Sequence, residues 1–356
     1  MIIVRTPYRV SLFGGGSDFP DWFTQHGGAV LTTSIDKYCY LTIRELPPFF
    51  SHKHRVVYGK SETVTSWNEI EHPVVREVLR VYQPSVGLEI HHDGDLPARS
   101  GIGSSAAFSV GILKAMDVLC KRDPTPEVLA SRAIRLETDA LSEFGGWQDQ
   151  IACSLGGLKM IRFSTDGAWT ASSVPMAEER SVELFSSLVL LYLGTPRQSS
   201  HVSEGLRPAI LGHSRVLEAT AKLAEAALDE LTQGTDPPHD VVGRLFNEAW
   251  TNKVELNSAA VTSSMVDVRR ILQAYGASGI KVSGAGGGGF LVCAVDPNRM
   301  DSFVEKASQV GTVVPFKPES QGSQVVFNDG ATIQSSINFE EGWFSGTVFG
   351  TRRDHC

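Results

Sequence analysis

The densest group of residues able to do chemistry is the segment Pro97-Ala-Arg-Ser-Gly-Ile-Gly-Ser-Ser-Ala-Ala107, which runs directly into an apolar-faced helix expected over residues 104–120. A helix N-terminus presents unpaired backbone N–H groups and the positive end of the helix dipole, and glycine lets a phosphate group approach the backbone closely. The segment therefore predicts a binding site for nucleotide phosphates. The simpler alternative is that Ser104 only caps the helix.

Two other phosphate-binding patterns fit the chain poorly. The P-loop pattern fails because His54 stands where the first glycine belongs ahead of Gly-Lys-Ser at residues 59–61. Residues 101–106 do match the permissive dinucleotide fingerprint Gly-x-Gly-x-x-Ala. However, a Pro-containing linker separates them from the preceding strand, and no later strand ends in an acidic residue at the required distance. We therefore favour a nucleotide-phosphate site over a nicotinamide site.

A second glycine cluster, Lys281-Val-Ser-Gly-Ala-Gly-Gly-Gly-Gly-Phe290, lies between two short predicted strands. A strand follows it instead of a helix, which excludes a dinucleotide-binding turn. The chain also lacks the His-Arg-Asp and Asp-Phe-Gly motifs of protein kinases. We interpret the cluster as a flexible backbone wall beside the phosphates or the acceptor. The alternative is a tight packing turn, which would hardly need five glycines in six residues.

Arg9 precedes a third glycine-rich segment, Gly14-Gly-Gly-Ser-Asp18, at the end of a predicted strand. A guanidinium group can stabilise charge that develops on a transferred phosphoryl group, and the Asp18 carboxylate can accept hydrogen bonds from sugar hydroxyls. Alone this segment is weak evidence, because Ser-Asp after glycine is also ordinary turn chemistry.

Two acidic residues, Glu137 and Asp149, flank Gly145-Gly146, which is expected to separate two helices. A helix-turn-helix of this length can bring both carboxylates into one pocket. One carboxylate would then bind Mg²⁺, and the other would orient or deprotonate a hydroxyl group. The alternative is that both are solvated, as most acidic residues on amphipathic helices are.

The elements that position these segments follow from hydrophobic periodicity. Strands are expected over residues 2–5 and 8–13 (broken by Pro7), 38–45, 88–92, 156–163, 188–193, 279–283, 290–295 and near 312–316. Helices are expected over residues 104–120, 127–141, from about 148, 202–232, 239–256, 264–275 and near 298–308. The two types alternate without a regular period, which indicates an α+β protein of two domains. The polar stretch between the strands at 156–163 and 188–193 is the best candidate boundary.

The composition is that of a globular protein. The chain has 356 residues, 42% hydrophobic and 20% charged, and its 34 glycines exceed the ordinary share of roughly 7% by about nine. Its net charge is −8 without long runs of either sign, so we expect no nucleic-acid partner and no membrane surface. Five scattered cysteines form no Cys-x-x-Cys pair, and no signal peptide or membrane span is recognised. We therefore expect a soluble, cytoplasmic protein without structural zinc.

Taken together and in this order, the four segments resemble those of the GHMP kinase superfamily, from residue 1 to about 316. Gly-Ile-Gly-Ser-Ser-Ala-Ala is similar to its second motif, with Ile for the usual Leu, and the Lys281–Phe290 cluster to its third. Gly-Gly-Ser-Asp stands where galactokinases have Gly-Glu-His-Thr-Asp, which disfavours galactose as the substrate. Arg-Thr-Pro-Tyr-Arg, Phe-Gly-Gly-Gly-Ser-Asp and Gly-Gly-Trp-Gln-Asp-Gln look most like the D-glycero-D-manno-heptose 7-phosphate kinases, which make the 1,7-bisphosphate for surface-polysaccharide precursors.

The resemblance implies a role for each segment. It implies Asp149 as catalytic base, Arg9 at the transferring phosphate, and Mg²⁺ held by Ser105 (Ser104 less favoured) and Glu137. The expected ATP-binding residues are Pro97, Arg99, Ser100, Gly101, Gly103, Ser104, Ser105 and Ala106. The expected sugar-binding residues are Gly16, Ser17, Asp18, Gly286 and Gly287.

A phosphate already carried by the acceptor needs a basic partner. Arg55, in the basic group His52-Lys-His-Arg55, and Arg197 are the two candidates, and a solvated basic turn is the alternative for the first.

The resemblance also implies the domain organisation. Residues 1–185 would form an ATP-binding domain like ribosomal protein S5 domain 2, residues 186–320 a ferredoxin-like domain, and residues 321–356 an unassigned tail. A sugar or sugar-phosphate substrate and a monomer or homodimer are expected. Fucose or another free sugar as acceptor, and a non-catalytic relative that only binds nucleotide or sugar, remain alternatives; a decarboxylase of the same fold is disfavoured by the first motif.

Overall fold

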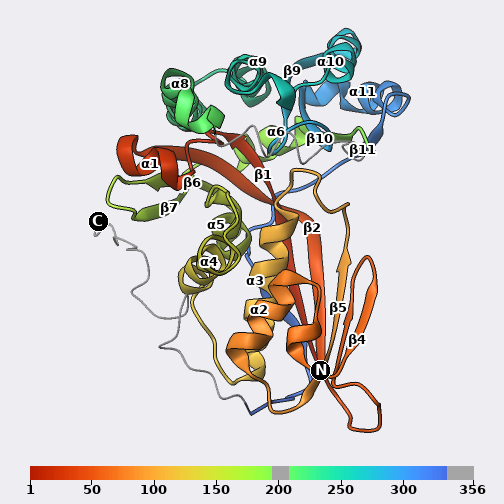
Figure 1. Cartoon of the computed structure of the whole chain (residues 1–356). Coiled ribbons are helices and arrows are strands. Elements are labelled where there is room, and N and C mark those ends of the chain that lie inside the picture. The colour runs from red at the N-terminus through yellow and green to blue at the C-terminus, as the bar shows by residue number, and fades with distance from the viewer. Residues whose placement is uncertain (195–207, 335–356) are drawn as a thin grey trace.

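The computed structural model describes residues 1–194 and 208–334, and its strands form two sheets, one in each of two domains (Figure 1). The larger sheet has eight strands in the order β12-β1-β2-β5-β3-β4, with β6 paired to β2 and β7 to β6. Its strands are β1 (Ile2–Phe13), β2 (Gly28–Leu46), β3 (His54–Val57), β4 (Ser61–Val64), β5 (Gly87–Gly94), β6 (Leu158–Phe163), β7 (Trp169–Ser173) and β12 (Gln324–Asn328).

The first strand is continuous, so the prediction of two strands broken by Pro7 is wrong. Pro7 pairs with Tyr38 of β2, and the register shifts between Pro7 and Arg9. Such an irregularity accommodates a residue that has no N–H to donate to the ladder. Strand β2 begins at Gly28, ten residues before the predicted strand 38–45. The prediction misses its first half because buried Thr and Ser side chains interrupt the apolar pattern there.

Helices cover one face of this sheet. They are α1 (Pro20–His26), α2 (Pro73–Tyr82), α3 (Ser104–Leu119), α4 (Pro126–Arg135) and α5 (Gln148–Leu155), and a 3₁₀ turn spans Trp67–Glu69. Helix α3 packs on β1, β2, α4 and α5 and is apolar almost all round, as a central helix must be. The helix predicted over 127–141 stops being α-helical at Arg135 and continues as a π-helical turn, η2 (Leu136–Ala140), which carries Glu137.

The second sheet is antiparallel, in the order β11-β8-β10-β9. Its strands are β8 (Leu188–Tyr192), β9 (Ala277–Val282), β10 (Phe290–Val295) and β11 (Thr312–Val314), with helices α6 (Glu178–Ser186), α8 (Ser214–Gln233), α9 (Pro238–Leu256), α10 (Ser263–Tyr275) and α11 (Met300–Ala307) and the 3₁₀ turns Ser258–Ala260 and Pro297–Arg299. Counted along the chain, the strand order is 4-1-3-2, which is ferredoxin-like. The predicted α+β, two-domain architecture is therefore confirmed, although residues 202–207 of the predicted helix 202–232 lie outside the described part.

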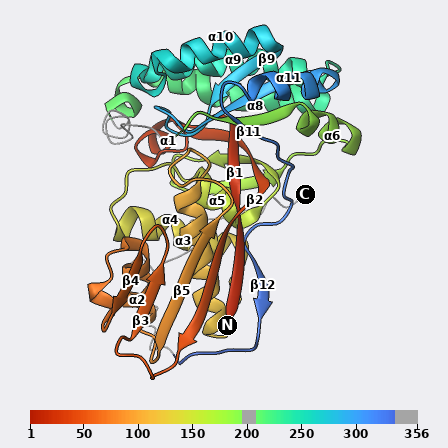
Figure 2. The same ribbon diagram turned by 90° about the vertical axis from the view of Figure 1, so that its right-hand side faces the viewer.

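The chain returns to the first sheet after β11 (Figure 2). Lys317 and Glu319 bond the backbone of β2 at Asp36 and Ser34, and β12 pairs antiparallel with β1. Residues 324–334, for which the sequence indicates no structure, are thus part of the N-terminal domain. Helix α6 begins before the expected boundary at residue 185, yet its Arg180 binds the carbonyls of Glu230 and Leu231. The exact boundary stays a prediction.

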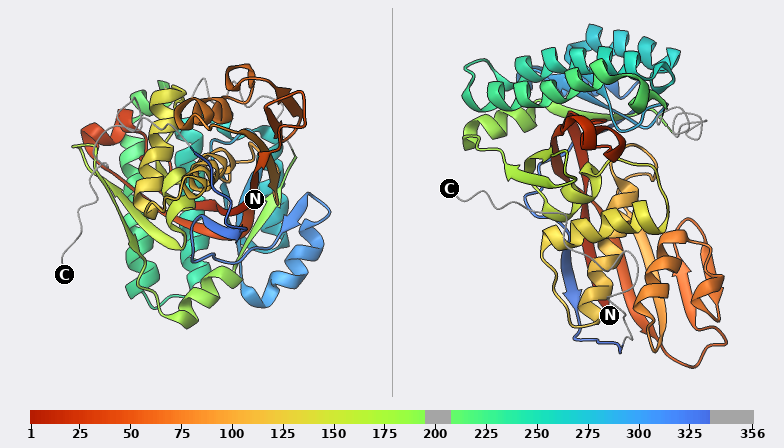
Figure 3. Two further views of the ribbon diagram at one scale, coloured as in Figure 1. Left: turned by 90° about the horizontal axis from the view of Figure 1, so that it is seen from below. Right: turned by 60° about the vertical axis from the view of Figure 1, so that its left-hand side comes forward.

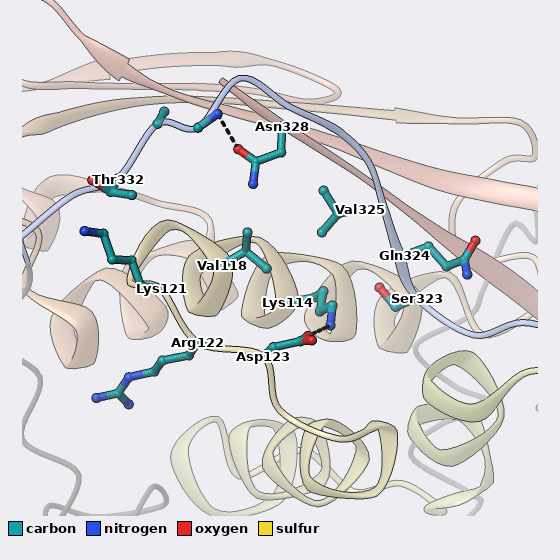
Figure 4. Close-up of a pocket in the computed structure, with 12 residues that line it drawn as sticks. Lys114, Val118, Lys121, Arg122, Asp123, Ser323, Gln324, Val325, Asn328 and Thr332 are labelled. Atoms are coloured by element: carbon teal, nitrogen blue, oxygen red, sulfur yellow. Dashed lines mark hydrogen bonds and ion pairs between the residues drawn. The ribbon is translucent and has the colours of Figure 1, made fainter.

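The returning tail supports the helix that carries Asp149. Gly157, just after α5, donates to the Glu319 carbonyl at 2.7 Å. A Cβ on Gly156 would lie 2.2 Å from the carbonyl carbon of Gln321, so only glycine fits there. Farther along, residues 323–332 cross the end of α3 and line one side of an open pocket of about 600 Å³ (Figure 4). In this pocket Lys114 pairs with Asp123 at 2.6 Å.

The two domains share one hydrophobic core. Helix α8 lies against β1 and β2, and the rings of Phe13 and Phe246 meet at a centroid distance of 5.3 Å. The right-hand view of Figure 3 shows the C-terminal helices stacked on one end of the larger sheet, and Figure 2 shows β3 and β4 at its other end. No helix within residues 1–194 and 208–334 is long and apolar enough to cross a membrane.

Gly156→Ala tests the contact between α5 and the tail. Gly167→Ala is the matched control, because Gly167 also has a positive φ but has open space where its Cβ would be. We expect the control to cost about 1 kcal/mol of unfolding free energy from backbone strain, and Gly156→Ala to cost at least about 2 kcal/mol more because the tail must move. Urea unfolding measures both, and equal losses would contradict the proposed support.

Candidate active site

A cavity of about 620 Å³ lies between the two domains. Its wall on the N-terminal side comes from β1, the loop before α3, η2 and the start of α5, and its wall on the C-terminal side from α8, α9, β9 and the second glycine cluster. The predicted residues that line it are Arg9, Gly16, Asp18, Gly101, Gly103, Ser104, Ser105, Ala106, Glu137 and Asp149. Folding therefore brings all four segments to one place.

Arg9 and Asp149 form a two-pronged ion pair in this cavity. Nε and Nη2 of Arg9 donate to Oδ1 and Oδ2 of Asp149, each at 2.6 Å, and Nη1 donates to the Gly101 carbonyl at 2.7 Å. The Arg9 backbone N–H also donates to the Ile102 carbonyl. One buried guanidinium thus fixes the end of β1, the loop before α3 and the first turn of α5 relative to each other.

The loop before α3 is shaped by glycine. Gly101 and Gly103 have φ of +85° and +73°, and Gly103 is the residue that precedes the helix. The residue at the N-cap of α3 is Gly103, and the Ser104 hydroxyl, inside the first turn, accepts a hydrogen bond from the Arg99 N–H at 3.1 Å. The alternative that Ser104 only caps the helix is therefore wrong. Pro97, Arg99 and Ser100 shape the loop from outside the cavity lining.

The second glycine cluster packs directly on this loop. The Ser283 hydroxyl donates to the Gly101 carbonyl at 2.7 Å, and a Cβ on Gly284 would lie 2.5 Å from the Gly101 Cα. A Cβ on Gly289 would lie 2.4 Å from the Ser100 carbonyl oxygen, and one on Gly286 would lie 2.3 Å from the Ala260 carbonyl oxygen. Tight packing therefore accounts for three of the five glycines. Gly284 and Ala285 line the cavity, whereas Gly286 and Gly287, predicted to bind substrate, do not.

Asp18 is held by two backbone segments. Its Oδ1 accepts from the Gly16 N–H at 2.8 Å and its Oδ2 from the Gln148 N–H at 3.3 Å. Burial raises the pKa of Asp18, and the two hydrogen bonds oppose that shift. Ser17 is fully buried, and its hydroxyl donates to the carbonyls of Gly14 and Ala29, so it faces away from the cavity.

Comparison with known proteins identifies the family. Two family models match the chain: GHMP kinases N terminal domain at residues 69–157 and GHMP kinases C terminal at residues 235–312. The mevalonate kinase of Methanothermobacter thermautotrophicus is 30% identical over 242 residues, which is 64% of this chain and 70% of that enzyme. The chain belongs to the GHMP kinase family. It is therefore an ATP-dependent phosphotransferase, as the sequence predicts.

Other relatives of this GHMP kinase have names that refer to heptose. The D-glycero-alpha-D-manno-heptose 7-phosphate kinase of Campylobacter jejuni is 22% identical over 334 residues, which is 90% of this chain and 97% of that enzyme. The crystal structure of a D-glycero-D-manno-heptose 1-phosphate kinase from Bacteroides thetaiotaomicron matches with a TM-score of 0.74 and 24% identity, over 92% of this chain and 99% of that chain. At this identity the structural likeness shows the fold alone.

The environment of Glu137 fits a metal ligand. Its Oε2 accepts a hydrogen bond from the Gln150 amide, whereas its buried Oε1 has no hydrogen bond in close geometry among the described residues, and the nearby Ser109 hydroxyl favours the charged carboxylate. Burial raises the pKa of Glu137 to about 7. No group of three or more His, Cys, Asp or Glu side chains able to hold a metal occurs in residues 1–194 and 208–334. Glu137 and Ser105 would therefore leave most ligand positions of a Mg²⁺ ion to phosphate oxygens and water.

The predicted phosphate ligand Arg55 lies elsewhere. It sits on β3, at the end of the sheet remote from the C-terminal domain, and does not line the cavity (Figure 2). Its guanidinium donates to Glu89 at 3.1 Å, and Arg44 and His91 bind the same carboxylate. A dense basic run in the sequence therefore indicates a surface ion-pair cluster here. The other candidate, Arg197, lies outside the described residues.

Two cavity residues that sequence reasoning missed are Lys253 on α9 and Lys281 on β9. Lys281 begins the second glycine cluster, which is a signal that could have found it. Lys253 lies on an amphipathic helix, where a lysine ordinarily indicates solvent. Both are desolvated by the cavity wall, which lowers the pKa of Lys253 to about 8 and that of Lys281 to about 7.

Glu137→Gln tests the burial of the carboxylate. Because the pKa of Glu137 is near 7 in the folded state and roughly 4.3 in an unfolded chain, the wild type loses stability as pH rises between these values. We expect the variant to escape this loss, so that it exceeds the wild type by about 3 kcal/mol at pH 8 and by little at pH 4.

Thermal unfolding in metal-free buffer across this pH range measures the difference, with exposed Glu255→Gln as the control. A difference between Glu137→Gln and the wild type that does not change with pH would contradict the prediction.

Proposed function

We propose that this GHMP kinase transfers the γ-phosphoryl group of ATP to the anomeric hydroxyl of D-glycero-D-manno-heptose 7-phosphate, giving the 1,7-bisphosphate used for surface-polysaccharide precursors. The observation that carries the proposal is the position of the Arg9–Asp149 pair, between the phosphate-binding loop and Asp18. The Campylobacter jejuni relative supports this choice of sugar, since its name carries the same substrate and it is matched over nearly its whole length. Because the reaction consumes ATP, we place the enzyme in the cytoplasm, as a monomer or homodimer.

The loop residues would bind the nucleotide. The first N–H groups of α3, beside Gly101 and Gly103, lack partners within the helix and face anionic oxygens favourably. Ser105 and Glu137 would hold Mg²⁺ against the phosphates. A bound Mg²⁺ supplies neutralisation of charge on the phosphate oxygens.

Arg9 and Asp149 would act at the transferred group. Arg9 places positive charge beside the phosphoryl oxygens. It also orients Asp149, whose two oxygens each accept one bond from Arg9 and keep further lone pairs for a substrate hydroxyl. Since an anomeric hydroxyl is more acidic than an ordinary alcohol, Asp149 need only orient it and accept its proton late in the transfer. Asp18 would accept hydrogen bonds from other sugar hydroxyls.

A panel of acceptors tests the substrate. ADP release is measured with sugar 7-phosphates, sugar 6-phosphates and the corresponding free sugars, each with and without Mg²⁺. We expect the highest kcat/KM with D-glycero-D-manno-heptose 7-phosphate and no turnover without the metal. A preference for fucose or another free sugar would overturn the choice of acceptor, and no ADP release with any compound would favour a non-catalytic binding protein.

Asp149→Asn tests the base. The amide keeps the shape of the side chain but cannot accept the proton, so we expect ADP formation to fall by at least about 100-fold, with nucleotide affinity nearly unchanged. Asp139→Asn is the control, because Asp139 is exposed in the neighbouring η2 turn and does not line the cavity. Steady-state kinetics and nucleotide titration measure the two effects, and retention of most turnover in Asp149→Asn would refute the assignment.

A further inference from the structure

The cavity is lined by three cationic side chains from separate elements, of which only one has a carboxylate partner. Arg9 of β1 is neutralised by Asp149. Lys253 donates its Nζ to the Gly284 carbonyl at 2.9 Å, and Lys281 to the Ser11 carbonyl at 2.9 Å. Within the described residues, neither lysine makes an ion pair with a carboxylate. The C-terminal wall therefore presents two amino groups for which the described residues supply no carboxylate partner.

The partial burial of both lysines makes this arrangement unfavourable by itself. An ammonium group taken out of water without a counter-charge costs folding free energy. Burial lowers the pKa of both lysines, and the pKa of Lys281 is lowered further by the charges of Lys253 and Arg9. Asp18 raises the pKa of Lys253, yet it lies too far away to form an ion pair with it. Two lysines without a carboxylate partner are expected where an anionic ligand supplies the negative charge.

The positions of the two lysines indicate where in the cavity an anionic ligand would bind. Lys253 binds Gly284, whose backbone touches Gly101 of the phosphate-binding loop. Lys281 binds the backbone of β1 two residues beyond Arg9. Both amines thus lie beside the boundary between the loop and the Asp18 side of the cavity. The pocket at the end of α3 differs in this respect, because its Lys114 already pairs with Asp123 (Figure 4).

We infer that Lys253 and Lys281 form a subsite for a phosphate dianion on the C-terminal wall of the cavity. Two ammonium groups balance the charge of one phosphate monoester, and each retains donors for its oxygens. The phosphate has two possible origins under the proposed function, on which this step rests: it is the one the acceptor already carries, or the phosphoryl group in transfer. In the first case Lys253 and Lys281 take the role that the sequence assigns to Arg55 or Arg197.

Binding of inorganic phosphate tests the subsite without catalysis. Calorimetric titration is carried out with ADP and Mg²⁺ at saturation, so that the phosphate-binding loop is already occupied. We expect Lys253→Met and Lys281→Met each to weaken phosphate binding by at least about tenfold, as removal of a charged hydrogen bond does. Lys222→Met is the control, because Lys222 is exposed on α8 and pairs with Glu218. Unchanged phosphate affinity in both cavity variants would overturn the subsite.

The melting temperature separates ligand binding from a structural role. Since each partly buried amino group without a counter-charge is unfavourable in the folded protein, both methionine variants should melt no lower than the wild type. A lower melting temperature together with unchanged phosphate affinity would show that the lysines only support the fold. Lys253→Gln and Lys281→Gln repeat the titration if a methionine variant does not fold.

Steady-state kinetics then identifies the origin of the phosphate. The variants are compared with heptose 7-phosphate and with unphosphorylated heptose. A KM at least about tenfold higher for the phosphorylated acceptor alone assigns the subsite to the acceptor phosphate. A lower kcat with both acceptors assigns it to the transferred group. If the wild type turns over no sugar phosphate, the proposed function fails, whereas the titration with inorganic phosphate still decides the subsite.

Discussion

The site depends on one buried guanidinium. Arg9 has hydrogen-bond donors on three sides, and a donor taken out of water must find an acceptor. The Gly101 carbonyl and the Asp149 carboxylate supply those acceptors. They lie 92 and 140 positions away from Arg9 in the chain, respectively. Satisfying this one group therefore fixes the loop before α3, β1 and α5 relative to each other. The geometry of this ion pair is thus set by the fold itself.

The second constraint is steric. The loop before α3 and the second glycine cluster meet backbone to backbone, with no room for a Cβ on Gly101, Gly284 or Gly289. This contact joins the two domains beside the cavity and lets peptide groups, instead of side chains, form much of its wall. A protein of net charge −8 can hold anions in this way, because backbone N–H groups and a few placed cations act locally where net charge does not.

The sequence could predict those parts whose signals are local. The glycine loops, helix α3 and strands β9 and β10 carry strong short-range patterns, and the architecture follows from their order. Arg55 was misplaced because the density of charge along a chain says nothing about the tertiary neighbour, here Glu89, that neutralises it. Lys253 was missed because a helical lysine that faces a cavity looks the same in sequence as one that faces water. Strand β12 was missed because it is short and forms only by pairing with β1.

The chain passes between the domains twice, once between β7 and α6 and once after β11. The two domains are thus joined by two connections, and the cavity lies between them. Lys253 and Lys281 belong to the C-terminal domain, while Arg9 and Asp149 belong to the N-terminal domain. A ligand that contacts both sides of the cavity would therefore hold the two domains together through its own charge.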